Sequence, residues 1–449
     1  MNISRAFFYA IDEVAKKDIP DEVMARARQS LLDYLSVTCA GAAFQKEKLQ
    51  DFFTFAEPEE EFRRVLFRST GRNLALKEAV FLNGLNGHAL DFDDGTNSGI
   101  IHLGSPIFSL LLPLAQRHDI TIVQLLRAAI IGYEASYTMA VTIQPKHKAL
   151  GYHATGTCGM LGATLAAAYM LGFSDEERYQ AFATACVSAS GMLKVLDDGS
   201  ELKPYNVAKT ALLSLTSLQL SKAGFKGHKD PLGGYRGFLK MMAGEEYIPI
   251  KPTLLNGTYA IMKSYTKPYA SCRYTHPPVE ATIHLRNQYG ITADTVQSIR
   301  VETYDLAVKG HDHTKILGAY SAKMSTPYST AVALIFGKAG LQEFSKETLD
   351  DKNVQALTEK VQVIADDNLS GIFPDRQSAI VTITTNEGIY SERVDYPKGE
   401  PENPLTDDEF LERYKALMAY GGIKESIYTS IYNKVSELGI KATDLIKDL

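Results

Sequence analysis

The chain has few cysteines, no excess of basic residues and no long apolar run, and each of these shortages excludes a class of protein. Its 449 residues contain four cysteines and no C-x-x-C pair, which excludes a disulfide framework and the common zinc and redox motifs. The net charge of −6 and the isoelectric point near 6.0 provide no basic surface for nucleic acid. We therefore expect a reducing, cytoplasmic setting and no nucleic-acid partner.

The apolar residues of the chain occur in short stretches. The longest, such as Ile107–Ala115, are far shorter than the run of about 20 residues that crosses a bilayer. The first residues, Met1–Asp12, lack the apolar core and cleavage site of a signal peptide. We expect no membrane partner, and the content of 45% hydrophobic and 22% charged residues is that of an ordinary globular protein.

Helical patterns dominate the first 265 residues. Pro20–Gly41 opens with proline and acids, repeats apolar residues at helical spacing and predicts a helix that stops at the glycine. Ser174–Glu177 is a capping-box pattern that predicts the start of another helix. Gly156–Gly172 is almost free of charge and rich in glycine and alanine, and its glycine spacing matches neither common phosphate loop. We predict a closely packed, buried helix there.

The pattern changes near residue 266. Val296–Val308 and Ser378–Val394 alternate β-branched and polar residues, and Asn386–Gly388 predicts a hairpin turn within the latter. Helical segments are expected between them, at 278–287, 325–336 and 350–367. The predicted fold is mainly α, with a large all-helical domain formed by both chain ends (residues 1–265 and 398–449) and a smaller inserted α+β lid domain (266–397).

One segment fits no pattern. Glu59–Thr70 follows neither helical nor strand periodicity. Within it, Arg63–Ser69 reads RRVLFRS, which a common sequencing-adapter end encodes in one reading frame. We hypothesise that this segment is an assembly artefact, and we leave it out of the fold prediction. Recovery of the same codons on resequencing would contradict the hypothesis.

The stretch His88–Pro106 concentrates ionisable residues, including Asp91, Asp93 and Asp94. An EF-hand is excluded because glycine stands at the fifth position counted from Asp91, where that loop needs it at the sixth. The pair His88 and Asp91 resembles part of a hydrolase metal site but lacks further ligands at close spacing. The stretch also suits a polar helix end followed by a loop, and we expect no metal.

Three further motifs place cations and histidines among small or apolar residues. Gly151–Thr157 contains His153, and the segment 203–209 begins at Lys203 and ends at Lys209. Lys267–Pro277 supplies two cations and a histidine at the expected domain junction. A single such residue is usually structural or solvated, but four motifs together indicate a functional site.

These motifs resemble the MmgE/PrpD family, which contains 2-methylcitrate dehydratase, cis-aconitate decarboxylase and iminodisuccinate epimerase. The resemblance rests on four segments in the family's order, Asn83–Asp94, Gly151–Thr157, Lys267–Pro277 and Ser325–Tyr328. It covers nearly the whole chain apart from the segment 59–70. It implies a large helical domain, a smaller α+β lid, an active site between them and a homodimer.

By motif position, the resemblance implies a pocket for a small di- or tricarboxylate, lined by Asp91, Thr96, His102, His153, Lys209, Lys267 and Tyr328. Two departures from the family pattern bear on the identity of the substrate. Gly95 separates the acid run from Thr96, and Leu103 stands where the family usually has proline.

The residue types suit carbanion chemistry next to a carboxylate. Lys209 and Lys267, together with Lys203 and Arg273, can hold the carboxylates and stabilise enolate charge. We assign His102 and His153 as the acid/base pair. Asp91 would fix the tautomer of a histidine or act as a base, and Tyr328 would donate a proton or a hydrogen bond. This chemistry requires no cofactor.

The leading prediction is a cofactor-independent lyase, specifically a hydro-lyase similar to 2-methylcitrate dehydratase. Decarboxylation of cis-aconitate and epimerisation of iminodisuccinate stay open, because both make similar demands on the pocket. Two alternatives belong to other classes. One is a metal-dependent hydrolase that uses His88, Asp91, His311 and His313, and the other is a helical dimer that binds a metabolite without turnover.

Overall fold

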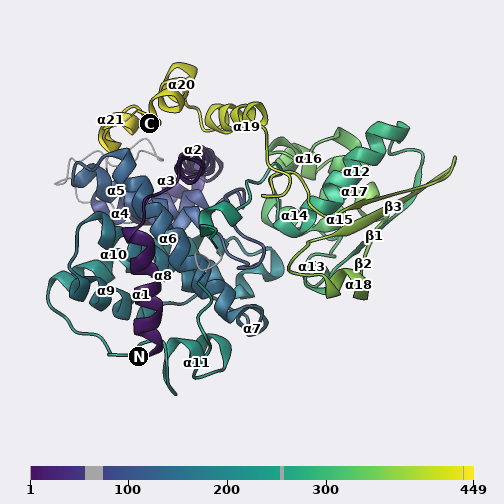
Figure 1. Ribbon diagram of the computed structural model, residues 1–449. Helices are drawn as coiled ribbons and strands as arrows, with labels where there is room; N and C mark the ends of the chain where they lie inside the picture. Colours follow the sequence, from purple (N-terminus) through teal and green to yellow (C-terminus); the bar gives the residue numbers. More distant parts are fainter. Residues whose placement is uncertain (1, 56–73, 253–256, 438) are drawn as a thin grey trace. The chain divides into compact units, whose positions relative to one another are not determined.

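The computed structural model describes residues 2–55, 74–252, 257–437 and 439–449. The segment Glu59–Thr70, which we hypothesise to be an artefact, lies outside the described residues. The chain divides into two compact units (Figure 1), of which the first comprises Met1–Leu193, Leu202–Ser264 and Asp408–Leu449, and the second comprises Lys194–Glu201 and Tyr265–Asp407. The functional domain boundaries and the lid role expected from the sequence stay predictions.

The described part of the first unit is built from helices (Figure 1), so the expectation of a mainly α protein is confirmed. These helices are α1 (Ile3–Lys16), α2 (Asp21–Phe44), α3 (Lys46–Phe55), α4 (Leu76–Gly87), α5 (Gly104–Arg117), α6 (Ile122–Ile143), α7 (Lys146–Ala149), α8 (Ala154–Met170), α9 (Asp175–Ser188), α10 (Lys203–Lys222), α11 (Phe238–Ala243), η3 (Ala260–Lys263), α19 (Asp407–Tyr420), α20 (Glu425–Lys434) and α21 (Ala442–Ile446).

Helix α8 forms the core of the first unit, as the glycine- and alanine-rich sequence predicts. It is buried along nearly its whole length and packs against α5, α6, α9 and α10. A Cβ atom at Gly162 would overlap the side chain of Ser136 and the backbone of Gly132, both on α6. Glycine therefore permits the close approach of the two helices.

Two features of the helix ends test the sequence patterns. The capping box predicted at Ser174 is present, because its hydroxyl accepts from the amide of Glu177 and the Glu177 carboxylate accepts from the amide of Ser174. The stop predicted at Gly41 is wrong, since α2 continues to Phe44. A Cβ atom at Gly41 would overlap the carbonyl oxygen of Asn86. This glycine serves close packing of α2 on α4 and does not end the helix.

The second unit contains a four-stranded sheet in the order β2-β1-β3-β4. Its strands are β1 (Val296–Thr303), β2 (Val361–Ala365), β3 (Ala379–Thr385) and β4 (Ile389–Val394). β1 pairs parallel with β2 and antiparallel with β3. The hairpin predicted at Asn386–Gly388 is confirmed, because β3 and β4 flank these residues and pair antiparallel. Alternate residues of β3 are buried, which matches the period of two in its sequence.

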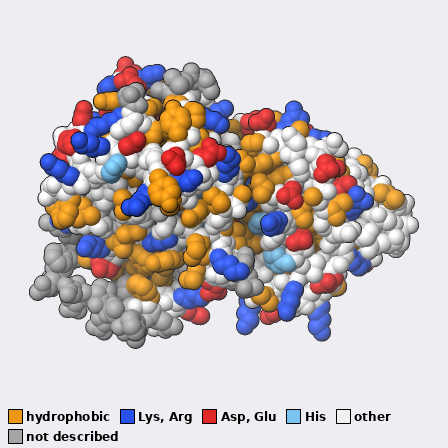
Figure 2. Space-filling view, turned by 90° about the horizontal axis from the view of Figure 1, so that it is seen from below, with side chains coloured by type: hydrophobic (Ala, Val, Ile, Leu, Met, Phe, Trp, Pro, Cys, Tyr) orange, Lys and Arg blue, Asp and Glu red, His pale blue; other side chains and the backbone are white. Residues whose placement is uncertain are grey.

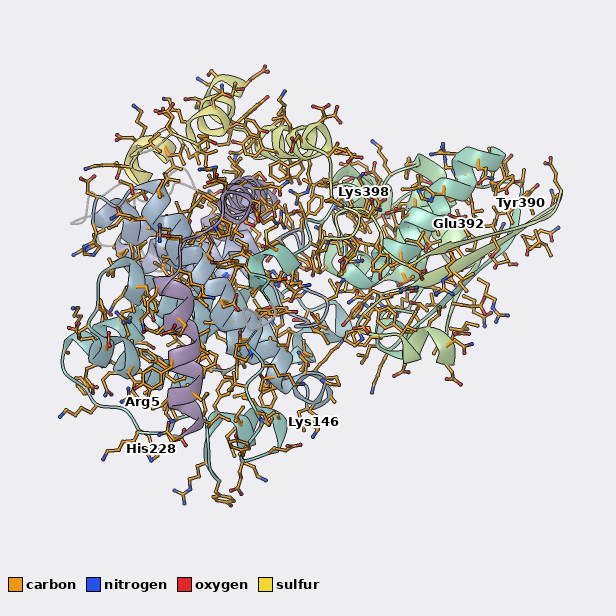
Figure 3. All side chains as sticks on the ribbon, viewed as in Figure 1. Arg5, Lys146, His228, Tyr390, Glu392 and Lys398 are labelled. Carbon is orange, nitrogen blue, oxygen red and sulfur yellow. The ribbon has the colours of Figure 1, made fainter. Side chains whose placement is uncertain are left out.

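The helices of the second unit are η1 (Leu193–Gly199), η4 (Arg273–Thr275), α12 (His276–Tyr289), α13 (Asp305–Val308), α14 (Ala319–Met324), α15 (Thr326–Phe336), η5 (Gln342–Phe344), α16 (Lys346–Leu349), α17 (Lys352–Thr358) and α18 (Asp367–Gly371). α12 packs against β3 and β4, and α15 packs against β2 (Figure 1). The rings of Tyr390 on β4 and Tyr289 on α12 have centroids 4.5 Å apart. The carboxylate of Glu392, also on β4, lies 3.5 Å from Nδ1 of His284 on α12. Figure 3 labels Tyr390 and Glu392.

Two predictions in this unit are wrong. The helix expected over 350–367 ends at Thr358, and β2 follows it. The strand expected over Val296–Val308 ends at Thr303, and α13 follows. In both cases a segment predicted as one element contains a helix and a strand. Short apolar runs are compatible with either structure, and tertiary packing determines which one forms.

The surface carries charges of both signs. On the face drawn in Figure 2, Lys and Arg side chains of the described residues are interspersed with Asp and Glu. Among the described helices, none combines the length and apolar character needed to cross a membrane.

Helix α19 is joined to α2 by an ion pair and to the acid-rich loop that follows α4 by a hydrogen bond. Arg413 of α19 pairs with Asp33 of α2, and both side chains are buried. The same guanidinium donates to the carbonyl oxygen of Phe92 at 2.8 Å. The C-terminal segment thereby fixes the backbone one residue before Asp93.

We predict that Arg413→Met lowers the free energy of unfolding by about 3–5 kcal/mol, because it leaves the buried Asp33 carboxylate without its cation. Urea unfolding of the first variant and of the double variant D33N/R413M measures the effect. The double variant should recover part of the loss, since it removes the unpaired charge. Equal stability of wild type and R413M would contradict this prediction.

Candidate active site

The loop between α4 and α5 is held in a strained conformation. Asp91 and Ile100 have φ values of 51° and 48°, in the left-handed region that residues with a side chain rarely adopt. Asp94 fixes the far side of the loop, since it accepts from the Tyr133 hydroxyl at 2.6 Å and from the Gly104 amide at 2.8 Å. Strain of this kind persists only where surrounding contacts enforce it, and it is concentrated at functional sites.

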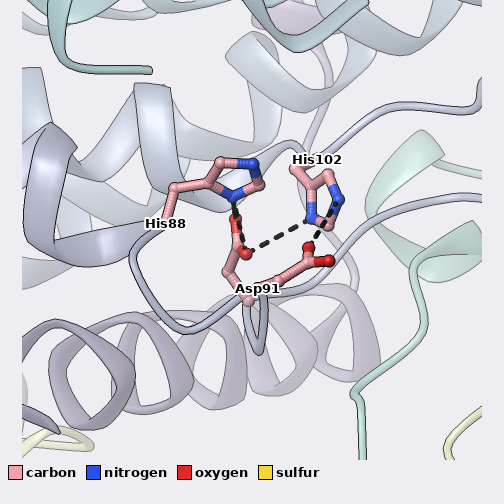
Figure 4. Close-up of side chains that lie close together, drawn as sticks. His88, Asp91 and His102 are labelled. Carbon is pink, nitrogen blue, oxygen red and sulfur yellow. Dashed lines mark hydrogen bonds and ion pairs between the residues drawn. The ribbon is translucent and has the colours of Figure 1, made fainter. Parts of the chain in front are cut away.

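Asp91 is the centre of a buried group of charges. The Lys203 ammonium, at the first turn of α10, lies 2.8 Å from Asp91 Oδ1. The Nε2 atom of His102 lies 3.6 Å from the same oxygen. Figure 4 shows the carboxylate of Asp91 directed at this imidazole. One carboxylate thus joins a lysine and a histidine that are about a hundred residues apart in the chain.

Asp93 joins two imidazoles in the same way. His88 Nδ1 lies 2.9 and 3.0 Å from its two oxygens, and His102 Nδ1 lies 3.4 Å from Oδ1. The hydroxyl of Ser105 donates to Oδ2 at 2.7 Å. His88, Asp93 and Ser105 are all buried.

His153 precedes the first residue of α8 and completes the cluster. The Asn206 side-chain amide of α10 lies 3.2 Å from its Nδ1 and donates to it. Its ring centroid is 5.8 Å from that of His88, and the His88 ring is 4.6 Å from the His102 ring. His88 therefore lies between the two histidines that the sequence analysis selected as acid and base.

Burial controls the protonation of this cluster. Burial lowers the pKa of His88 to about 4 and the pKa of His153 well below 6.5, where His88 and Lys203 add to the effect. Burial alone would raise the pKa of Asp93, but His102 and His88 outweigh it and hold that pKa well below its usual range. Near neutral pH, His88 and His153 are therefore neutral and Asp93 is ionised.

Two family models match the chain and identify its family. The family model of the MmgE/PrpD N-terminal domain matches residues 6–250, and that of the C-terminal domain matches residues 269–429. The chain belongs to the MmgE/PrpD family. The resemblance stated from the sequence motifs is thereby confirmed.

The chain is similar in sequence to several named proteins. The chain is 25% identical over 430 residues to a cis-aconitate decarboxylase of Aspergillus terreus, covering 90% of this chain and 86% of the relative. It is 21% identical over 436 residues to a cis-aconitate decarboxylase of Homo sapiens, covering 92% and 87%. A mitochondrial 2-methylcitrate dehydratase of Yarrowia lipolytica is 24% identical over 153 residues, which is 31% of this chain and 29% of the relative.

Four of the predicted site residues meet in this cluster, namely Asp91, His102, His153 and Lys203. The lysine that motif position selected, Lys209, has a different environment. Its ammonium donates to the Ser190 hydroxyl at 3.1 Å, and burial lowers its pKa. Lys203, which the sequence analysis named as an auxiliary cation, is the lysine that contacts Asp91. Thr96 is buried and pairs with Ile101 through its backbone.

The other three predicted residues belong to the second unit. Lys267 is buried, and its ammonium donates to the carbonyl oxygen of Ser271 at 3.1 Å. Arg273 is buried and pairs with Glu400, and burial lowers its pKa. The hydroxyl of Tyr328 donates to the carbonyl oxygen of Glu343 at 2.8 Å. Their part in the site stays a prediction.

Four residues of the cluster have no acid/base or positioning role in the sequence-based prediction. The motifs suggest His88 and Asp93 only as metal ligands, and they do not include Ser105 or Asn206. The signal for His88 is its place directly after α4, five residues before Asp93. No sequence signal marks Ser105 or Asn206, because such residues are common inside helices, and only the contacts of α5 and α10 with the loop select them.

A metal ion is the alternative occupant of this cluster. His88, Asp91, Asp93 and His102 each offer a ligand atom, and these atoms lie within 4.8 Å of one another. However, the Lys203 ammonium already contacts Asp91, and Asp93 already accepts from His88. The other ligands of the hydrolase alternative, His311 and His313, contact backbone carbonyls of the second unit. The donor set therefore fits a protein cation better than a metal ion.

The lowered pKa values give a prediction about pH. We expect His88 and His153 to remain neutral at about pH 5.5, where an unperturbed histidine is mostly protonated. Nitrogen NMR of histidine-labelled protein, assigned with H88N and H153N, measures this. Because their folded pKa values lie below 6.5, the unfolded chain binds protons first as the pH falls, so the stability that these residues contribute declines from about pH 6.5 downward. Titration of either ring near pH 6.5 would contradict the prediction.

Proposed function

We propose that the chain is a lyase that acts on a small di- or tricarboxylate at the cluster of His88, Asp91, His102, His153 and Lys203. The observation that carries the proposal is the buried contact of Lys203 and His102 with one carboxylate, Asp91, next to two further imidazoles. Such a group offers a fixed cation and several proton carriers in one buried place. Those are the requirements of reactions that pass through a carbanion beside a carboxylate.

Decarboxylation of a cis-aconitate-like acid is the first candidate reaction. The bond between a carbon and a carboxylate breaks, its electron pair stays on the carbon, carbon dioxide leaves and an imidazole supplies a proton to that carbon. The full-length similarity to relatives named as cis-aconitate decarboxylases favours this reaction over the dehydration expected from the motifs. In this scheme Lys203 stabilises the negative charge that develops on the substrate.

Dehydration of a 2-methylcitrate-like acid is the second candidate. Here a base removes a proton beside a carboxylate, and an acid protonates the hydroxyl group that leaves as water. The same cluster supplies both groups, and a 2-methylcitrate dehydratase is similar to part of the chain. Epimerisation of iminodisuccinate needs only removal and return of a proton, so the same residues would also serve it.

The two histidines differ in what they can do. His153 accepts from Asn206 at Nδ1, so its neutral ring carries the proton on Nε2 and acts as a hydrogen-bond donor. His102 presents Nε2 beside Asp91, so that nitrogen exchanges protons with the substrate while Asp91 orients the ring.

We further propose that the second unit acts as a lid and that its residues Lys267, Arg273 and Tyr328 contribute to the pocket. We also propose that the enzyme is a cytoplasmic homodimer.

Incubation of the protein with cis-aconitate, 2-methylcitrate and iminodisuccinate tests the proposed function. We expect release of carbon dioxide from cis-aconitate, with water loss and racemisation followed in parallel for the other two acids. Activity should be unchanged after chelation of divalent metal, because Lys203 provides the cation. Loss of activity with chelator would favour the metal-dependent hydrolase, and binding of an acid without turnover would favour a metabolite-binding protein.

A pair of lysine variants tests the assignment of the cation. We predict that Lys203→Met lowers kcat/KM by about 100-fold or more, because it removes a charge that faces the developing carbanion. Lys209→Met, six residues along the same helix, serves as the comparison and should lose less activity than K203M, because Lys209 contacts Ser190 and not Asp91. Thermal unfolding of both variants separates loss of chemistry from loss of fold. A larger loss of activity in K209M than in K203M would contradict the assignment.

A further inference from the structure

The two ring nitrogens of His102 face different partners. Nδ1 lies 2.9 Å from the carbonyl oxygen of Asp94 and 3.4 Å from Oδ1 of Asp93. A carbonyl oxygen only accepts hydrogen bonds, and the carboxylate of Asp93 is ionised near neutral pH. The proton on Nδ1 is thus held by two acceptors. Nε2, which faces Asp91, is the nitrogen left for chemistry.

The carboxylate of Asp93 is itself held by two donors. His88 Nδ1 donates to it at 2.9 Å, and the Ser105 hydroxyl donates to Oδ2 at 2.7 Å. All three groups are buried, so the loss of a donor would leave an acceptor without a hydrogen bond, which is energetically unfavourable. Loss of His88 would leave the buried carboxylate supported by the Ser105 hydroxyl and by His102, and less firmly held against rotation or protonation.

Of the two ring nitrogens of His88, Nδ1 has a hydrogen-bond partner and Nε2 has none among the described residues. The Nε2 atom is buried, while Nδ1 faces Asp93. A side chain that only filled space at this position would not need an N–H group directed at a carboxylate. The interactions of His88 therefore point to a role that is exerted through Nδ1.

We propose that His88 is a positioning residue for His102, and that it acts through Asp93. His88 and Ser105 fix the ionised Asp93, which together with the Asp94 carbonyl fixes the Nδ1–H tautomer and the orientation of His102. His102 then presents Nε2 to Asp91 and to the substrate. This inference rests on the acid/base role given to His102 in the proposed function.

Amide variants of His88 test which nitrogen acts. An asparagine amide can place an N–H group near the position of Nδ1, whereas a glutamine amide places it near Nε2. We expect H88N to retain kcat within about tenfold of wild type, and H88Q and H88A to lose about 100-fold or more with little change in KM. Equal loss in all three, or greater retention by H88Q than by H88N, would overturn the proposal in favour of proton transfer at Nε2 or of a packing role.

Asp93→Asn provides a second test in case the His88 variants fold poorly. The amide replaces one of the two acceptor oxygens by an N–H donor and removes the negative charge, while it keeps the shape of the side chain, and we expect a loss of kcat at least as large as that of H88A. The matched control is Ser105→Ala, which removes one of the two donors to Asp93 and should cost less than H88A. Wild-type kcat in D93N would overturn the proposal.

The tautomer of His102 can be read without turnover. In nitrogen NMR spectra of histidine-labelled wild-type protein above about pH 8, we expect the His102 signals of a ring protonated at Nδ1. D93N and H88A should shift these signals towards the other tautomer, and H88N should not. A ring protonated at Nε2 in the wild type would overturn the proposal, even if no substrate is found. Normal tautomers together with absent turnover would instead count against the proposed function alone.

Discussion

Three acidic residues of one loop, Asp91, Asp93 and Asp94, are buried in a helical unit, and the hydrogen bonds and ion pairs that they require organise the site. A buried carboxylate is costly unless it is paired and hydrogen-bonded. Each acid meets this requirement differently. Asp91 takes a lysine, Asp93 takes imidazole and hydroxyl donors, and Asp94 takes a phenol and a backbone amide. The cluster of reactive groups follows from these pairings.

The surrounding helices make these pairings possible by approaching closely. Gly162 lets α8 approach α6, and Gly41 lets α2 contact the end of α4, where the acid-rich loop begins. α8 begins directly after His153 and α10 begins at Lys203, so the starts of these helices bring an imidazole and an ammonium to the loop. Arg413 adds a contact from the C-terminal helices to the carbonyl of Phe92. Residues from distant parts of the chain therefore converge on the loop because the helix packing is dense.

The histidines of the site lie in two different environments. His88 and His153 are neutral because burial disfavours their charged forms, whereas His102 lies beside two carboxylates. A site with both kinds can donate and accept protons without a bound cofactor. That property suits the lyase reactions proposed for this member of the MmgE/PrpD family.

The sequence by itself determined the mainly α class, the buried helix over residues 156–172, the hairpin around residue 387 and the family, because these depend on local periodicity and on short motifs. It also selected Asp91, His102 and His153. Only the tertiary structure places Lys203 against Asp91 and Lys209 against Ser190, since six residues on a helix correspond to a rotation of about 600° and so to different faces. It likewise places His88 and Asp93 next to His102, because such contacts depend on how α4, α5 and the loop pack, which no local pattern encodes.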